Sequence, residues 1–170
     1  MIYQYPAQQT NLLTPIHSWD VLAGAMRQFF SLRTLDLQVL NKYRSTLNWE
    51  IAPELLDKIG QNRSEAIVLT DKRQAIIWVN NQFTDLTGYK LEEAKGKNPN
   101  FLQGERKDPL LNKQLRENLK NGESFTQTVL NFSKSGKAYH CYMTIYPIFN
   151  KQSELVNYLA FENETDSSAA

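Results

Sequence analysis

The sequence predicts an α+β fold, in which a five-stranded antiparallel sheet carries helices on one face. Two short β-rich runs come first, at residues 66–70 and 75–79. Several helical patterns follow up to about residue 120, and three longer β-rich segments come after them. Strands that are grouped on either side of a block of helices indicate antiparallel pairing, with the helices packed against the sheet.

The first two strands are predicted to form a hairpin. Ala66–Thr70 and Ala75–Val79 are rich in isoleucine, valine and other residues that favour strands. The segment Asp71–Gln74 between them is short and polar, which suits a tight turn.

The helical block begins directly after the second strand. The Asn80-Asn81 pair can cap a short helix over Gln82–Thr87, which Gly88 ends. Short helical pieces are expected over about 91–102. The stretch 108–120 is predicted to be a longer amphipathic helix, and the leucines on one of its faces are Leu111, Leu115 and Leu119.

The last three strands are predicted at Ser124–Phe132, Ala138–Phe149 and Leu155–Glu162. Their connections, Ser135-Gly136 and Asn150–Ser153, are rich in residues that form turns. Each pair of neighbouring strands is therefore expected to form a hairpin.

Residues 1–62 are predicted to form an N-terminal extension with two to three helices. Residues 1–15 are polar and show no clear period, which is typical of an extended or disordered segment. Ser18 can cap a first helix, whose apolar face carries Trp19, Leu22, Met26 and Phe29. A second helix starts near Thr34, and its apolar face carries Leu37, Leu40, Tyr43 and Leu47.

A third short helix can start at Pro53, cover Glu54–Ile59 and stop at Gly60. The predicted division of the chain is an extension over 1–62, a sheet-forming domain over 63–165 and a disordered tail over 166–170.

Composition and charge argue against two classes of partner. Of the 170 residues, 41% are hydrophobic and 22% are charged, as in ordinary globular domains. A formal net charge of +1 provides no field that would attract nucleic acid or an anionic membrane. Neither is expected as a partner.

Cysteine usage and the N-terminus predict a cytoplasmic location. Cys141 is the only cysteine, which excludes an intrachain disulfide and a zinc site built from several cysteines. A chain without disulfides fits a reducing compartment. The first basic residue is Arg27, so the charged start of a signal peptide is missing, and no apolar run approaches the roughly 20 residues that cross a bilayer.

Three motifs occur in a fixed order within the sheet-forming domain. The run Asn80–Tyr89 follows the second strand, Gly96–Gly104 lies among the helical pieces, and Leu130–Lys137 covers the end of a strand and its turn. In this order they resemble the PAS domain family, and most closely its light-oxygen-voltage (LOV) subgroup, over roughly residues 64–165. The resemblance implies the PAS fold and a sensory function.

The LOV motif differs from the flavin-binding pattern at two neighbouring positions. In flavin-binding relatives a cysteine forms a reversible bond with the excited flavin, and Pro99 stands at that position here. Proline has no nucleophilic group, so the resemblance implies a domain without this photochemistry. Pro99 instead suits the start of a short helix. Asn100 replaces an arginine that binds the flavin phosphate.

The other cofactor positions of the resemblance are partly retained. Arg116 matches a second phosphate-binding arginine, and Gln103 and Asn131 match polar positions that contact the ribityl chain and the ring. Cys141 replaces a second ring-binding asparagine, and Glu162 replaces the switch glutamine of the last strand. The candidate cofactor-binding positions are thus Asn98, Gln103, Arg116, Asn131, Cys141 and Glu162.

Several of these residues also have structural interpretations. Cys141 is either a small buried filler or a redox sensor, and Arg116 is either a phosphate ligand or an exposed helix residue. Glu162 either faces the pocket or is solvated.

The resemblance implies FMN or FAD as the candidate cofactor. Haem is not expected, because PAS haem proteins usually carry the haem ligand on the long helix, and the stretch 108–120 contains no histidine. His140 and His17 do not suggest a metal pair.

The apolar face of the first helix, formed by Trp19, Leu22, Met26 and Phe29, either packs within the chain or forms a dimer interface. We expect a homodimer, because helices that flank PAS domains commonly mediate association.

The expected function is that of a sensory module for signal transduction, without enzyme activity. No nucleophile–base pair, metal cluster or phosphate loop is recognisable in the sequence. A ligand or partner would change the PAS pocket, and the N-terminal helices would transmit the change. Few residues follow the last strand, so an unidentified signalling partner would provide the output, unless the sequence is a fragment. The alternative is a flavin-binding redox or light sensor that lacks the adduct cysteine.

Overall fold

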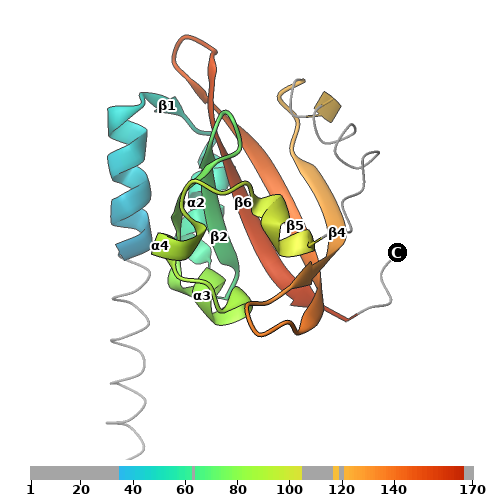
Figure 1. The fold of residues 1–170 in the computed structure, drawn as a ribbon. Helices are drawn as coiled ribbons and strands as arrows, with labels where there is room; N and C mark the ends of the chain where they lie inside the picture. Colours follow the sequence, from blue (N-terminus) through green and yellow to red (C-terminus); the bar gives the residue numbers. More distant parts are fainter. Residues whose placement is uncertain (1–34, 63, 105–116, 119–120, 167–170) are drawn as a thin grey trace, which may run out of the picture.

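A curled antiparallel sheet forms the centre of the computed structural model, which describes residues 35–62, 64–104, 117–118 and 121–166 (Figure 1). Its strands run in the order β3-β2-β6-β5, and both β4 and β1 pair with β5. The strands are β1 (Trp49–Glu50), β2 (Ala66–Asp71), β3 (Ile76–Val79), β4 (Phe125–Phe132), β5 (Ala138–Asn150) and β6 (Leu155–Thr165).

The predicted α+β class and all five predicted strands are confirmed. β1 is an additional sixth strand, which pairs Trp49 with Asn150 and Glu50 with Phe149. It is only two residues long, too short for any alternation of polar and apolar residues to predict it. β6 continues to Thr165, three residues beyond its predicted end.

Three short helices cover one face of the sheet. They are α3 (Asn81–Thr87), α4 (Leu91–Ala94) and the 3₁₀-helix η1 (Pro99–Gln103). The predicted cap and stop of α3 are confirmed, since the Asn80 side chain accepts a hydrogen bond from the N–H of Phe83 and Gly88 has a left-handed φ of 76°. The helices pack on the pocket-side cluster: Ala66, Val68, Ile76, Val79, Phe83, Ala94, Leu102 and Ala160.

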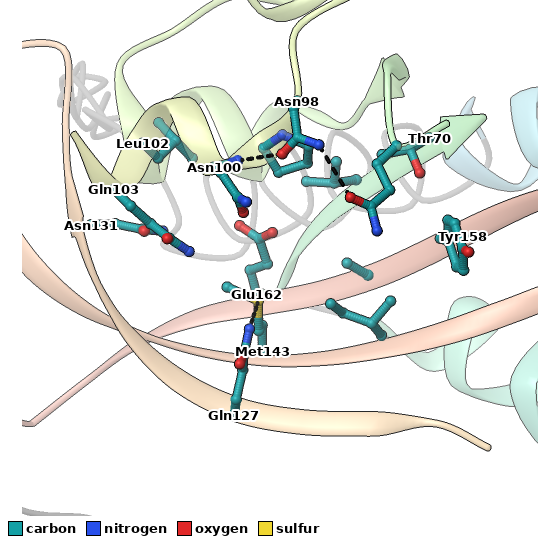
Figure 2. A pocket seen from close by; sticks show the side chains of 15 residues that line it. Thr70, Asn98, Asn100, Leu102, Gln103, Gln127, Asn131, Met143, Tyr158 and Glu162 are labelled. Atoms are coloured by element: carbon teal, nitrogen blue, oxygen red, sulfur yellow. Dashed lines mark hydrogen bonds between the residues drawn. The ribbon is translucent and has the colours of Figure 1, made fainter. Parts of the chain in front are cut away.

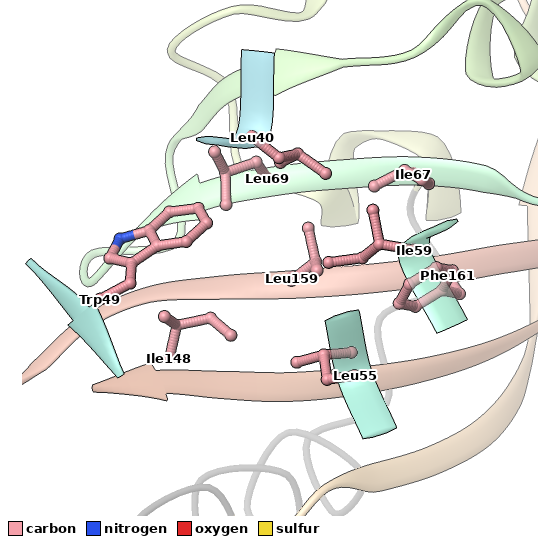
Figure 3. Close-up of a cluster of buried hydrophobic side chains, with 9 residues drawn as sticks. All are labelled: Leu40, Trp49, Leu55, Ile59, Ile67, Leu69, Ile148, Leu159 and Phe161. Atoms are coloured by element: carbon pink, nitrogen blue, oxygen red, sulfur yellow. The ribbon is translucent and has the colours of Figure 1, made fainter. Parts of the chain in front are cut away.

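Two further helices cover the opposite face, so the sheet carries helices on both sides. They are a helix over residues 35–46, called helix 35–46 below, and α2 (Pro53–Gln61). Figure 3 shows the buried residues between these helices and the sheet. This N-terminal cluster consists of Leu40, Trp49, Leu55, Ile59, Ile67, Leu69, Ile148, Leu159 and Phe161.

The sequence of β2 explains why both faces are covered. Ile67 and Leu69 belong to the N-terminal cluster, whereas Ala66 and Val68 on the other face belong to the pocket-side cluster. A strand that is apolar on both faces must be buried on both. Residues 35–62, the described part of the predicted extension, therefore complete the core of the sheet, and their apolar side chains Leu37 and Tyr43 also pack against this cluster.

The α2 helix begins at Pro53, as predicted, but Gly60 does not end it. The helix continues to Gln61, and the N–H of Asn62 donates to the carbonyl of Ile59 at its end. Gly60 is not among the glycines with positive φ, so the chain does not use its freedom to stop the helix here.

Several predicted features lie outside the described residues. They are the segment 1–15, the first helix with its apolar face, most of the helix predicted over 108–120, and residues 167–170 of the tail. Within the described part of the chain, no helix is both long enough and apolar enough to span a membrane.

Candidate functional site

A cavity lies between η1 and the face of the sheet that the short helices cover (Figure 2). The centres of water molecules can occupy about 60 Å³ of it, which is room for a few waters or a small ligand. Its apolar lining includes Val68, Leu102, Met143, Ile145 and Ala160. Its polar lining is Thr70, Gln74, Asn98, Asn100, Gln103, Gln127, Asn131, Tyr158 and Glu162.

Strand register brings the central polar residues together. Gln127 on β4 pairs with Met143 on β5, and Met143 pairs with Glu162 on β6. Residues paired in this way point to the same face of a sheet. Asn131, four residues after Gln127, lies on that face too. Figure 2 shows Glu162 pointing from β6 toward η1, with Gln103 and Asn131 at one side.

Local hydrogen bonds shape the η1 wall of the cavity. Pro99 is the first residue of this helix, where its fixed φ is favourable. The Asn98 side chain accepts from the N–H of Asn100 at 3.0 Å and donates to the side-chain oxygen Oε1 of Gln74 at 3.2 Å. Pro99 and Asn98 therefore both contribute to the shape of this wall.

Two amide oxygens at the cavity are buried without a hydrogen-bond partner. They are Oδ1 of Asn131 and Oε1 of Gln127. The Gln127 amide nitrogen has only a weak contact, 3.5 Å from the sulfur of Met143. Leaving a buried acceptor unpaired costs roughly 1–3 kcal/mol. Such atoms are typical of a site that receives its partner from a ligand or water.

Glu162 is the buried carboxyl group of this cavity, with 3% of its surface exposed. Its side-chain hydrogen bond is with the thiol of Cys141, 3.9 Å from Oε2. Burial raises the pKa of Glu162 to about 7, and the thiol opposes this only in part. The structure thus decides between the two interpretations of this residue, since Glu162 faces the cavity and Glu164 is exposed.

Cys141 lies beside the cavity and is completely buried. It packs with Val129, Tyr139 and Met143. Burial is the main cause that raises the pKa of its thiol, and the nearby Glu162 raises it further. A thiol in this environment stays protonated at neutral pH, as expected of a buried filler and not of a reactive cysteine.

The structure brings together four of the predicted site residues: Asn98, Gln103, Asn131 and Glu162 line the cavity. Cys141 contacts Glu162 but does not line the cavity, and Arg116 lies outside the described residues. Gln127 was missed, although the two-residue period of β4 leads from Asn131 to it. Thr70 and Tyr158 were also missed, and their pairing across β2 and β6 depends on a register that sequence alone does not fix.

A sequence model of the PAS domain family matches residues 64–166. The chain belongs to the PAS domain family. Blue-light-activated histidine kinase 1 of Erythrobacter litoralis is 32% identical over 139 residues, which cover 80% of this chain and 38% of the kinase. Phototropin-1A of Oryza sativa subsp. japonica is 30% identical over 95 residues, which cover 56% of this chain and 10% of the phototropin.

Solved structures agree with this assignment. A light-oxygen-voltage domain studied with a flavin analogue has a TM-score of 0.59 at 29% identity, over 67% of this chain and 86% of that one. The LOV domain of the Erythrobacter litoralis EL346 histidine kinase has a TM-score of 0.55 at 24% identity, over 61% of this chain and 97% of that one, and shows the same fold. The PAS domain described here spans less than two fifths of the curated relatives named above.

The cavity of this PAS domain fits a flavin in part. The amides of Gln103, Asn131 and Gln127 can pair with the polar edge of a ring or with hydroxyl groups. At Glu162, however, a flavin would meet a carboxyl group where the LOV resemblance has an amide, and Cys141 lies outside the lining.

Proposed function

We propose that this PAS domain is a sensory module in which a small ligand in the cavity, or a partner protein, changes the packing of the N-terminal helices. The observation that carries the proposal is the pair of buried, unpartnered amide oxygens on Asn131 and Gln127. A purely structural core would satisfy or replace such groups, because they destabilise the free protein.

Asn157 is the contrasting case in the same sheet. It is 1% exposed, and its side chain accepts from the indole N–H of Trp49 at 2.9 Å and donates to the Thr70 carbonyl at 2.8 Å. This buried amide has a structural role, since it links β1 to β6 and β2. The side-chain oxygens of Asn131 and Gln127 have no such role, which supports a ligand-binding one.

Shared strands provide a route from the cavity to the N-terminal helices. Along β6, Ala160 and Glu162 line the cavity, whereas Phe161 between them belongs to the N-terminal cluster. The Phe161 ring lies under α2, with the ammonium nitrogen of Lys58 4.4 Å from its centroid. A shift of β6 at the cavity would therefore change the surface on which α2 packs.

Asn80 provides a second route. Its side-chain oxygen accepts from the N–H groups of Ile67 and Phe83, and its nitrogen donates to the Glu65 carbonyl and, at 3.4 Å, to Asp36 of helix 35–46. One side chain thus connects β2, the start of α3 and an N-terminal helix.

The proposed module has neither cysteinyl-flavin photochemistry nor enzyme activity. Pro99 supplies no thiol at the start of η1, and the single thiol of the sequence, on Cys141, is buried with a raised pKa. We further propose that the module forms a homodimer through Trp19, Leu22, Met26 and Phe29, and that a signalling partner in the cytoplasm receives its output.

The second candidate function is a flavin-binding redox or light sensor without the adduct. It is favoured by the same amides and by the likeness to light-oxygen-voltage domains. Gln103, Asn131 and Gln127 would hold the flavin, and the flavin would supply the absorption of light or the transfer of electrons.

An absorption spectrum combined with native mass spectrometry tests both candidates. The proposed function predicts that the wild-type protein carries a non-covalently bound small molecule, which Asn131→Leu reduces, and that the protein is colourless. Yellow protein that releases flavin supports the second candidate. If the wild-type mass equals that of the chain alone and matches Asn131→Leu, the cavity has no ligand and this part of the proposal fails.

A further inference from the structure

We propose that the cavity of this PAS domain selects a small cationic ligand that combines an apolar ring with N–H donors, and that Glu162 is its counter-ion. The inference rests on the proposed function, because it names the chemical class of ligand for the same cavity. An amidinium or a protonated benzylic amine represents this class.

In the described lining of the cavity, the buried side-chain atoms without a hydrogen-bond partner are acceptors. Glu162 presents a carboxyl group, and Asn131 and Gln127 present amide oxygens without partners. Among the described residues that line the cavity, none carries a positive charge. A buried carboxylate without a cation is strongly disfavoured, and so are buried acceptors without donors. A cation with several N–H groups corrects both deficits, whereas an anionic ligand corrects neither.

The rest of the lining accounts for the apolar part of the ligand. Val68, Leu102, Met143 and Ile145 present hydrocarbon or thioether surface to the same space. Met143 pairs directly with Glu162 across the strands, so apolar surface lies next to the carboxyl group. A ring can pack on these side chains while its charged substituent reaches Glu162.

The neighbours of Glu162 make it the group that would respond to pH in the neutral range. Cys141 and Tyr139 on β5 both have a pKa raised by burial, so they stay protonated there. Glu164 on β6 and Asp85 at the end of α3 share a groove with Glu162 but are exposed. The described residues of η1 and the inward-facing residues of β4 add no acid or base.

Ligand affinity should therefore depend on the ionisation of Glu162. Its raised pKa means that the carboxyl group is mostly protonated below about pH 7 in the free protein. A cation binds the ionised form and lowers this pKa, so binding strengthens as the pH rises through that value. Between pH 6 and pH 8, the ionised fraction and hence the affinity should increase about tenfold.

Benzamidine is a suitable probe, and benzamide is its neutral counterpart of nearly the same shape. Titration into the full chain, followed by the NMR shift of the Met143 methyl group, reports binding in the cavity. We expect benzamidine to bind more tightly than benzamide at pH 8, and Glu162→Gln to weaken it by about tenfold or more. The matched control Glu164→Gln, at an exposed neighbour, should leave the affinity unchanged.

The outcomes separate this inference from the proposed function. If benzamide binds as tightly as benzamidine, or if the affinity is the same at pH 6 and pH 8, the cation preference is wrong while the cavity remains a ligand site. The pH series uses wild-type protein, so the test stands even if Glu162→Gln does not fold. If neither probe shifts Met143 at millimolar concentration, the inference is overturned, and native mass spectrometry alone decides the proposed function.

Discussion

Glu162 is the residue at which stability and binding conflict. Its carboxyl group is buried, and its side-chain hydrogen bond is a long contact with a thiol. Asn157 on the same strand shows that this sheet can satisfy a buried polar side chain completely. A poorly satisfied group that persists beside a satisfied one is typical of a functional site, where binding compensates for the loss of stability.

The first prediction concerns the pH dependence of stability. Burial raises the pKa of Glu162 from 4.5 to about 7, so between these values the folded state keeps a proton that the unfolded state has lost. The free energy of unfolding should fall as the pH rises through this window, by on the order of 3 kcal/mol from this group, and stay level above it.

Urea unfolding of wild-type protein and Glu162→Gln over this pH window measures the effect. In the glutamine variant, the free energy of unfolding should not show the decrease that the ionisation of Glu162 causes. Asp36, whose pKa burial also raises, contributes to both proteins and cancels in the difference. If the free energies of unfolding of the two proteins changed with pH in parallel, the raised pKa of a buried Glu162 would be wrong.

At the scale of the elements, Asn80 holds three of them together. The side chain caps α3, binds the N–H of Ile67 on β2 and reaches Asp36 on helix 35–46. It is only 3% exposed, and its bonds to the N–H groups of Ile67 and Phe83 are shielded from bulk water. The position of helix 35–46 thus depends in part on a single amide.

Asn80→Ala should lower the free energy of unfolding by roughly 2 kcal/mol, because it removes a helix cap and leaves buried N–H groups unpaired. Asn98→Ala is the matched control, since Asn98 caps η1 in the same way but is exposed. Asn98→Ala should lower the free energy of unfolding by less than about 1 kcal/mol. Equal losses in chemical denaturation would show that Asn80 acts only as an ordinary cap.

Elements with a clear period could be predicted from the sequence, and contacts between distant elements could not. The predicted strands 66–70 and 138–149 either are mostly apolar or alternate between polar and apolar residues. Their ends agree with those of β2 and β5 within a residue or two. The packing of helix 35–46 and α2 on the second face was not predicted, because periodicity shows that a face is apolar but not what covers it.

In the candidate site, too, residues of local motifs could be predicted and residues brought in by distant contacts could not. Asn131 and Gln103 were found through a local motif, and both line the cavity. Thr70 and Tyr158 enter it only because β2 pairs with β6, and the chain separates these strands by more than eighty residues. The burial of Glu162, which decides its chemistry, also depends on this tertiary packing.

At the scale of the whole molecule, the described residues form a sheet with the cavity on one face and helix 35–46 and α2 on the other. Both faces share β2 and β6, so neighbouring residues of one strand belong to the cavity and to the N-terminal cluster in turn. Removal of residues 35–62 would expose Ile67, Leu69 and Phe161, so this segment is structurally part of the sensor.

The central claim is that occupancy of the cavity changes the packing of helix 35–46 and α2. Ala160→Leu on β6 tests it most directly, because the larger side chain fills cavity space and requires no identified ligand. Amide hydrogen exchange of wild type and variant is the measurement, with the free energy of unfolding of each protein from urea denaturation as the reference for global stability, because β2 itself pairs with Ala160. We expect exchange in residues 35–62 to change several-fold more than the difference in global stability accounts for; exchange in this segment that follows global stability alone would contradict the claim.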